Sequence, residues 1–430
     1  MTEHVQGGLS VASTRGDGTV AVRSDRSARR PSRRTTPWQT VFARALAVVF
    51  GLLLPLLLLE ISIRLFGPFL PGNYDTGAFV RRHPTLGHYH VPNYHGWTKT
   101  PQFTTELRTN WMGFRDPRQS YAKAPGTYRI LALGDSYVEA SQVQANQMTT
   151  ALLERRLTEA TGRPVEVING GVFGYGTAQE YLLLDELGAQ YQPDVVLLFF
   201  CHCNDVANNN YRLELIDADL GRALKPYYDL ANDEDTLRFI PPPPPSTQTN
   251  IRQRLRDTSL LYNIIETGVV YKFELQNPLE PFNGIDGLLD PVRGKYDATP
   301  TGEWSRGWRI TEAIIQKLRD RSSALGARLA VVEVPAWRML DEAYWQRDNN
   351  KRLVESRKGG PDAPVQLLDE IADRLELPHL DLGGAFRPRV AADGLTTYYI
   401  AGDYHWTVAG NAVAADAVAA FLAERGLLPR

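Results

Sequence analysis

Two kinds of hydrophobic pattern run along this chain. Residues 45–59 form an unbroken apolar stretch, and apolar residues on both sides extend it to about 41–66. This length exceeds the roughly 20 residues that span a bilayer and predicts one transmembrane helix. After residue 126, short apolar runs typical of parallel strands buried on both faces alternate with helical patterns. That βαβα order predicts an α/β domain whose parallel sheet carries helices on both faces.

The individual elements follow from these patterns and from the glycines that end them. Strands are expected at 128–133, 165–168, 195–200, 328–334 and 379–382. Helices are expected at 148–158, 177–187, 251–271, 308–325, 367–375 and 407–424. The predicted helices and strands then lie in the order that a doubly wound sheet requires.

The apolar helix is interpreted as an uncleaved signal anchor rather than a cleaved signal peptide or a buried core helix. No small-x-small cleavage site follows Leu59, and Glu60 with Arg64 forms an i,i+4 pair suited to the membrane interface. Pro55 can kink such a helix without excluding it from a membrane. Eight arginines and three acids precede residue 47. The positive-inside rule therefore predicts a cytoplasmic N-terminus and an extracytoplasmic remainder, periplasmic or on the cell surface.

Composition divides the chain further. Residues 1–37 are rich in Ser, Thr, Gly and Arg and predict a disordered basic arm, followed by the anchor at 38–67. Residues 68–126 predict a small juxtamembrane β-rich segment, and 127–430 the main α/β domain with an insertion at about 206–306. The net charge of −2 gives no sign of nucleic-acid binding, and 43% hydrophobic content suffices for a sizeable core.

Four short motifs follow predicted strands or precede a predicted helix. They are Gly134-Asp135-Ser136, Asn169-Gly170-Gly171-Val172-Phe173-Gly174, His202-Cys203-Asn204-Asp205 and Asp403-Tyr404-His405. Residues beyond the carboxyl ends of parallel strands converge at one edge of the sheet, so the first three should meet there. A serine becomes a nucleophile only when a base removes its proton, and a histidine beside an aspartate is such a base.

In these motifs and their order, the chain from about residue 125 to the C-terminus resembles the SGNH (GDSL-type) hydrolase superfamily, with its flavodoxin-like sheet. The resemblance implies that Ser136 is the nucleophile, His405 the general base and Asp403 the residue that orients the imidazole. It also implies an oxyanion hole made by the backbone N–H groups of Ser136 and Gly174 and by the Asn204 amide. No metal or other cofactor is implied.

The chain departs from the usual family motifs at two places. His202 stands where a glycine is common, and its imidazole is expected to narrow or polarise the pocket. The last motif reads Asp-x-His followed by Trp406, where Asp-x-x-His is common. In this it resembles the branch that contains the alginate O-acetylation proteins and related envelope acetyltransferases, which implies glycan substrates and a multi-pass acyl donor protein as a partner.

Three further groups of residues could contribute chemistry. Cys201 and Cys203 are the only cysteines, and because a bond between residues i and i+2 would be strained, free thiols are expected near the pocket. Residues 68–126 contain His83, His88, His90 and His95, of which His88 and His90 could share one face of a strand and bind zinc or copper. The favoured interpretation is a β-rich segment with a polar aromatic surface. Tyr227, Tyr228, Trp304 and Trp308 are candidate sugar-stacking residues beside an insertion that forms a lid or wall of the cleft.

The sequence thus predicts a membrane-anchored serine esterase or O-acyltransferase that acts on acylated, most simply acetylated, envelope or exopolysaccharide glycans. Hydrolase and transferase stay open, because one triad serves both. Two alternatives also stay open. One is a lipid or lysophospholipid esterase, which requires an apolar acyl tunnel rather than an open polar cleft. The other is a non-catalytic assembly factor that uses the cleft only to bind glycan.

Overall fold

The computed structural model describes residues 37–66, 74–75, 79–118, 120–217, 225–231, 236–244, 251, 254–255, 258–265, 294–346, 354 and 358–429. The predicted basic arm up to residue 36 and much of the predicted insertion lie outside these residues. The chain divides into two compact units, one ending at Leu57 and the other running from Leu58 to Arg430.

The predicted N-terminal helix is present as α1 (Pro37–Phe66), with Pro55 inside it. An 18-residue window within residues 38–66 has a mean hydropathy of 2.6, and the apolar side chains of α1 are mostly exposed. Within the helix, Arg64 pairs with Glu60 at 2.7 Å. The helix is therefore long and apolar enough to cross a membrane.

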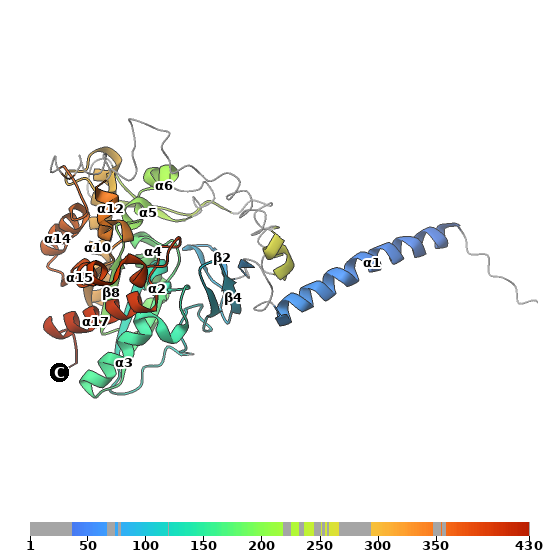
Figure 1. Cartoon of the computed structure of the whole chain (residues 1–430), viewed down its shortest axis with the longest axis horizontal. Coiled ribbons are helices and arrows are strands. Elements are labelled where there is room, and N and C mark those ends of the chain that lie inside the picture. The colour runs from blue at the N-terminus through green and yellow to red at the C-terminus, as the bar shows by residue number, and fades with distance from the viewer. Residues whose placement is uncertain are drawn as a thin grey trace, which may run out of the picture. The chain divides into compact units, whose positions relative to one another are not determined.

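Five parallel strands form the central sheet (Figure 1). They are β6 (Tyr128–Gly134), β7 (Val165–Gly171), β8 (Val195–Phe200), β11 (Arg328–Glu333) and β12 (His379–Asp381). Their order across the sheet is β12-β11-β8-β6-β7. This is the flavodoxin-like order, and it places the switch point, where ligands bind in such folds, between β6 and β8. The predicted fold class is confirmed.

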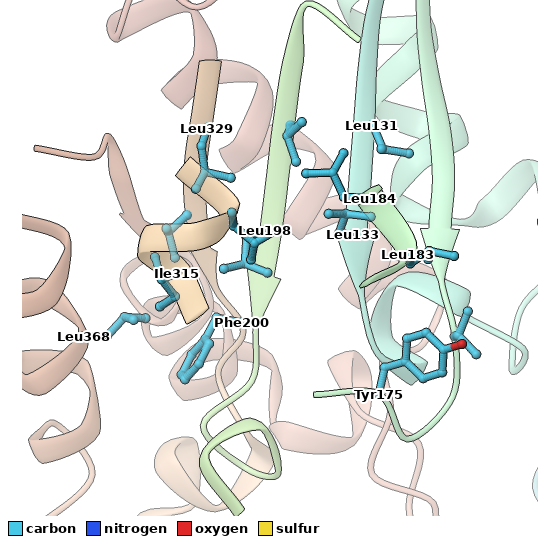
Figure 2. Close-up of a cluster of buried hydrophobic side chains, with 14 of the residues drawn as sticks. Leu131, Leu133, Tyr175, Leu183, Leu184, Leu198, Phe200, Ile315, Leu329 and Leu368 are labelled. Carbon is cyan, nitrogen blue, oxygen red and sulfur yellow. The ribbon is translucent and has the colours of Figure 1, made fainter. Parts of the chain in front are cut away.

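Helices cover both faces of this sheet. One face packs against α4 (Thr177–Glu186), α10 (Gly302–Ala324) and α14 (Ala363–Arg374); the other packs against α3 (Thr149–Thr161), α15 (Gly383–Asp393) and α17 (Val408–Glu424). Side chains alternate along each strand, so Leu131 and Leu133 of β6 face α4 and α10, whereas Ile130 and Ala132 face α3 and α17. Figure 2 shows the first layer, in which strand leucines meet Leu183, Leu184 and Ile315 from the helices. Each buried aliphatic side chain contributes roughly 1.5–3 kcal/mol.

Several short helices connect these elements in the described part of the chain. They are the 3-10 helices η2 (Ala145–Gln147) and η3 (Gly188–Tyr191), and the helices α2 (Ser136–Glu139), α5 (Asp205–Asn209), α6 (Tyr211–Asp217), α11 (Trp337–Leu340), α12 (Glu342–Trp345) and α16 (Leu395–Tyr398). Residues 260–265 of the predicted helix 251–271 are helical, and its end from 266 lies outside the described residues.

The juxtamembrane segment is β-rich, as predicted. β1 (Tyr74–Asp75), β4 (His95–Lys99) and β5 (Thr104–Arg108) form one antiparallel sheet, and β2 (Val80–His83) pairs with β3 (Gly87–His90) in another. Leu86, Tyr89 and Phe114 are buried in the same hydrophobic cluster as Leu183 and Tyr175. This segment therefore shares the core of the catalytic sheet instead of standing apart as a spacer.

The insertion contains an antiparallel hairpin, β9 (Tyr227–Leu230) and β10 (Leu237–Ile240), that the sequence patterns did not predict. The candidate sugar-stacking residues Tyr227, Tyr228, Trp304 and Trp308 are all buried, with at most 7% of their surface exposed. The Tyr227 hydroxyl donates to Glu214, and Trp308 packs on Phe200 under the sheet. Their prediction as sugar platforms is wrong, because large aromatic side chains most often serve as core.

Candidate active site

The turn from β6 into α2 presents Ser136. Asp135 caps α2 by accepting a hydrogen bond from the N–H of Tyr137 at 2.9 Å. A Cβ at Gly134 would lie 2.5 Å from Val138, so only glycine fits where the strand turns so tightly into the helix. Ser136 is thereby fixed at the carboxyl end of the strand beside the switch point.

His405 and Asp403 meet Ser136 from the other end of the chain. His405 Nε2 lies 2.8 Å from Ser136 Oγ, and His405 Nδ1 lies 2.8 Å from Asp403 Oδ1. Because a carboxylate only accepts, Nδ1 carries the proton and Nε2 is free to accept from Ser136. Burial favours the neutral imidazole, but the hydrogen bond and charge of Asp403 outweigh it and raise the pKa of His405 above its ordinary value of 6.5.

Neighbouring aromatic residues hold the histidine loop in place. The Tyr137 hydroxyl donates to the carbonyl of Tyr404 at 3.0 Å, and the buried Trp406 stacks on Phe386. Tyr404 itself has a φ of +71°, which is uncommon for a bulky residue and turns the chain between Asp403 and His405. This turn lets two residues only two positions apart point at each other.

Asn204 reaches the same site from the carboxyl end of β8. Its Nδ2 donates to Asp135 Oδ2 at 3.0 Å, so the amide nitrogen and its two protons face the Ser136 turn. One proton is engaged by Asp135, and the geometry leaves the other for a ligand.

The two cysteines before Asn204 form a disulfide, so the expected free thiols are wrong. Cys201 and Cys203 are joined with a Cα–Cα distance of 5.0 Å, inside the usual range for disulfides. The expectation rested on the strain of a bond between residues i and i+2, whose Cα atoms lie about 6.4–6.8 Å apart in an extended strand. Instead β8 ends at Phe200 and the chain turns at once, which brings the two Cα atoms closer together.

Gly174 lies in a turn directly after β7. Its φ is +68°, and a Cβ at this position would meet nothing within 4 Å. Glycine is therefore required here by the backbone conformation, rather than by a neighbour that would clash.

A cavity of about 290 Å³ joins these residues. Ser136, Gly174, Asn204, Asp403 and His405 all line it. The structure thus brings together every residue that the sequence assigned to the site. The insertion adds Glu214, Lys295 and Tyr296 to the lining, in keeping with its predicted place at the wall of the cleft.

The outer part of the cavity contains residues that the sequence analysis missed. Trp337 and Tyr404 stack with ring centroids 4.4 Å apart, Arg338 lies over Trp337, and Phe173 is 42% exposed. All four line the cavity. Trp337 follows β11 by only four residues, so the rule that strand ends converge could have identified it.

His202 does not line the cavity, and its expected narrowing of the pocket is wrong. Its side chain is buried beneath β11, with Nδ1 lying 3.2 Å from Glu333. Burial lowers the pKa of His202 to about 3, so the imidazole is neutral. The imidazole therefore faces Glu333 of β11 instead of the cavity.

Two buried carboxyl groups beside Asp135 have strongly shifted pKa values. Burial, together with the charge of nearby carboxylates, raises the pKa of Glu180 and of Asp205 well above the ordinary range. Burial also raises the pKa of Asp135. Burial therefore disfavours the charged form of these carboxyl groups.

The histidines of the juxtamembrane segment bind protein groups at different places. His90 contacts Glu139, His95 contacts Glu106, and His88 contacts the carbonyl of Phe173. Among the described residues, one group of possible ligand atoms, from Asp135, Cys201 and Cys203, lies close enough for a metal. Its sulfur atoms are joined in the disulfide, whereas a metal binds the thiolate form.

Comparisons with known proteins agree with this geometry. The family described as "GDSL-like Lipase/Acylhydrolase" matches residues 132–270, and the "SGNH hydrolase-like domain, acetyltransferase AlgX" matches residues 301–429. These matches include Ser136, Gly174 and Asn204 in the first region and Asp403 with His405 in the second. Among curated proteins, none matches the chain significantly.

Solved structures with similar folds are distant in sequence. An acetylxylan esterase from Geobacillus stearothermophilus is 14% identical to this chain and has a TM-score of 0.36. The match covers 70% of this chain and 94% of the esterase. A protein of Parabacteroides merdae described as GDSL-like lipase is 10% identical, with 70% and 96% coverage and a TM-score of 0.36. Likenesses this remote do not bear on substrate or mechanism.

This protein is an enzyme of the class that hydrolyses esters or transfers acyl groups. Within it, the chain belongs to the SGNH (GDSL-type) hydrolase superfamily and combines a GDSL-like region with an AlgX-type region.

Proposed function

We propose that this protein is a membrane-anchored serine esterase or O-acyltransferase that acts on acetyl esters of envelope or exopolysaccharide glycans. The observation that carries the proposal is the line of contacts from Ser136 Oγ to His405 Nε2 and from His405 Nδ1 to Asp403, each 2.8 Å long. Nucleophile, base and orienting carboxylate are recognised by this geometry rather than by their order in the chain.

In the proposed reaction, Ser136 attacks the ester carbonyl while His405 takes the serine proton. The N–H groups of Ser136 and Gly174 and the Asn204 amide receive the negative charge that develops on the carbonyl oxygen. His405 then gives its proton to the departing sugar oxygen, which leaves an acyl-Ser136 ester. Water or a second sugar hydroxyl attacks that ester with His405 again as base, so the products differ but the residues do not.

The size and lining of the cavity favour a short acyl group. Its 290 Å³ lies at the lower end for ligand pockets. Asn208, Lys295 and Arg338 bring polar or charged side chains to it, beside the stacked Trp337 and Tyr404. A lipid esterase would need an apolar tunnel, whereas polar groups next to exposed aromatic rings suit a carbohydrate.

The location of the site follows from two features. The Arg-rich arm before α1 favours a cytoplasmic N-terminus, and this orientation would place residues after α1 outside the cytoplasm. Disulfides persist in oxidising compartments, and the Cys201–Cys203 bond supports that orientation. As a transferase, the protein would take its acetyl group from a multi-pass acyl donor protein, as the AlgX-type region suggests.

The test is ester cleavage by the full chain in nanodiscs, with p-nitrophenyl esters from acetyl to long-chain and Ser136→Ala alongside. Turnover that requires Ser136 and is confined to short acyl chains is the expected result. A preference for long chains would replace the glycan substrate by a lipid. If the wild-type protein is no faster than Ser136→Ala on any ester, transfer is tested next with an acetyl donor and polysaccharide acceptors. If no acetyl group is transferred either, the protein is a non-catalytic glycan-binding factor.

A further inference from the structure

The turn that carries Gly174 has a conformation with two alternatives. The N–H of Tyr175 donates to the carbonyl of Val172 at 3.1 Å, which closes a four-residue turn over 172–175. Within it, φ is positive at Gly174 and not at Phe173, the pattern of a type II β-turn. A type I turn through the same residues differs mainly by turning over the central peptide, which contains the Phe173 carbonyl and the Gly174 N–H.

The turn itself supplies little preference between these alternatives. Glycine populates positive and negative φ about equally. A side chain at residue 174 would also meet no neighbour within 4 Å, so packing at this position does not select one conformation. Something outside the turn must fix the central peptide.

His88 of β3 contacts that peptide. Its Nε2 lies 2.7 Å from the Phe173 carbonyl oxygen, and because a carbonyl only accepts, Nε2 donates. His88 is held in turn by Tyr175, whose hydroxyl donates to the His88 carbonyl at 2.6 Å and whose ring meets the imidazole edge to face. Burial lowers the pKa of His88 to about 4, so the donor is a neutral imidazole.

The same strand fixes the peptide on the other side of Phe173. The Phe173 N–H donates to Glu139 at 2.5 Å, and His90 Nε2 lies 3.1 Å from the same carboxylate. Burial favours the neutral acid, but the hydrogen bond and charge of His90 hold the pKa of Glu139 below its ordinary value. Two histidines of β3 thus orient both peptide units that flank Phe173, one directly and one through Glu139.

We infer that His88 is a positioning residue of the oxyanion hole. In a trans peptide the carbonyl and N–H point in opposite directions, so a carbonyl held toward β3 directs the Gly174 N–H away from β3. Gly174 lines the cavity with Ser136 and Asn204, so an N–H directed away from β3 would be placed to donate there. The inference rests on the proposed function, in which the Gly174 N–H receives charge from the substrate oxygen.

The contact also strengthens the donor that it positions. A hydrogen bond to the carbonyl polarises the amide, and such chains strengthen each bond by about 10–30%. Loss of His88 would therefore act in two ways: the central peptide would be free to turn over, and the remaining N–H would be a weaker donor.

The experiment compares His88→Leu, which removes the donor, with His88→Gln, which keeps a side-chain N–H. His95→Gln is the matched control, since His95 lies on β4 of the same segment and contacts Glu106 instead. Full-length proteins in nanodiscs are assayed with p-nitrophenyl acetate, and hydrogen–deuterium exchange is followed in peptides covering 172–176. His88→Leu is expected to lower kcat about 10- to 100-fold with KM within threefold, below the cost of removing an oxyanion donor outright. It should also exchange faster at 172–176.

His88→Gln should recover most of the kcat and the slow exchange, and His95→Gln should match wild type. Equal losses in His88→Leu and His88→Gln, with lowered thermal midpoints in both, would show a packing role and overturn the inference. Unchanged exchange at 172–176 in His88→Leu would overturn it as well, whatever the kcat. Absence of Ser136-dependent turnover in wild type would instead count against the proposed function, and exchange at 172–176 would still decide whether His88 holds the turn.

Discussion

Replacing Asp403 by Asn tests how the carboxylate supports His405. Both the backbone N–H of His405, at 3.2 Å, and its Nδ1, at 2.8 Å, point to the same oxygen, Oδ1. An Asn side chain with its oxygen in that place would accept both hydrogen bonds. The substitution should therefore keep the productive tautomer, with the proton on Nδ1, and remove only the negative charge.

The size of the effect follows from that difference. A hydrogen bond to a charged group contributes about 1.5–3 kcal/mol, against about 0.5–1.5 for a neutral one. The imidazolium that forms during the reaction loses roughly the difference, 1–2 kcal/mol, which corresponds to about a 5- to 30-fold lower kcat at 1.36 kcal/mol per decade. Where the same change forces the wrong tautomer, as in a serine protease, the loss is about 10⁴-fold.

The pH dependence gives a second readout. His405 acts as a base only when neutral, so kcat/KM should rise with pH through the His405 pKa. Because Asp403 raises that pKa, the wild-type rise should be centred above 6.5. In Asp403→Asn the burial that favours neutral imidazole persists while the charge is gone, so the rise should move below 6.5.

The assay is kcat and kcat/KM for p-nitrophenyl acetate between pH 5 and 9, with Asp416→Asn as control. Asp416 lies on α17, is exposed and pairs with Arg156 of α3, so the Asp416→Asn substitution should leave activity within about twofold. A kcat for Asp403→Asn as low as that of Ser136→Ala would refute the tautomer reasoning. A wild-type kcat with an unmoved pH profile would show that Asp403 does not support the base at all.

Two other changes test neighbouring parts of the site. Asn204→Ala removes an oxyanion donor and leaves Asp135 without its amide partner, so kcat should fall about 100- to 1,000-fold with little change in KM; a loss under threefold would exclude Asn204 from the oxyanion hole. Replacing Cys201 and Cys203 together by Ser opens a very small ring, so the free energy of unfolding should fall by only about 1.5 kcal/mol with kcat retained. Denatured wild type without reductant should show no thiol in a colorimetric titration, and two reactive thiols would contradict the disulfide.

The sheet and the residues at its edge could be predicted because the signals are local. Four strands of the central sheet, β6, β7, β8 and β11, are largely apolar, and Gly, Asp, Ser and Asn stand at or soon after the ends of β6, β7 and β8. The convergence of such ends follows from the parallel topology, whichever helices lie between. The positions of Ser136 and Asn204 at this edge could therefore be predicted without knowing how the helices pack.

The errors arose where packing decides. Tyr227 and Trp308 have the composition of a sugar platform, but their burial depends on how the insertion folds onto α10, which no periodicity records. The disulfide was missed because strain was judged for an extended backbone, whereas the chain turns directly after β8 and brings the two Cα atoms to 5.0 Å. His202 was placed by analogy to a glycine, and its imidazole lies under β11 instead.

The juxtamembrane segment shows the same limit and has a mechanistic consequence. Its histidines drew attention as possible metal ligands, yet His88 and His90 both act on Phe173, from a strand about 85 residues away in sequence. Arg115 of the same segment donates to the backbone carbonyl of Glu139 at 2.9 Å, beside the end of the Ser136 helix. The β-rich segment that follows α1 is therefore part of the scaffold around Ser136 and Gly174. A domain drawn from residue 127 onward would contain Ser136, Asp403 and His405 but would lack His88 and His90, which contact the turn over 172–175 directly and through Glu139.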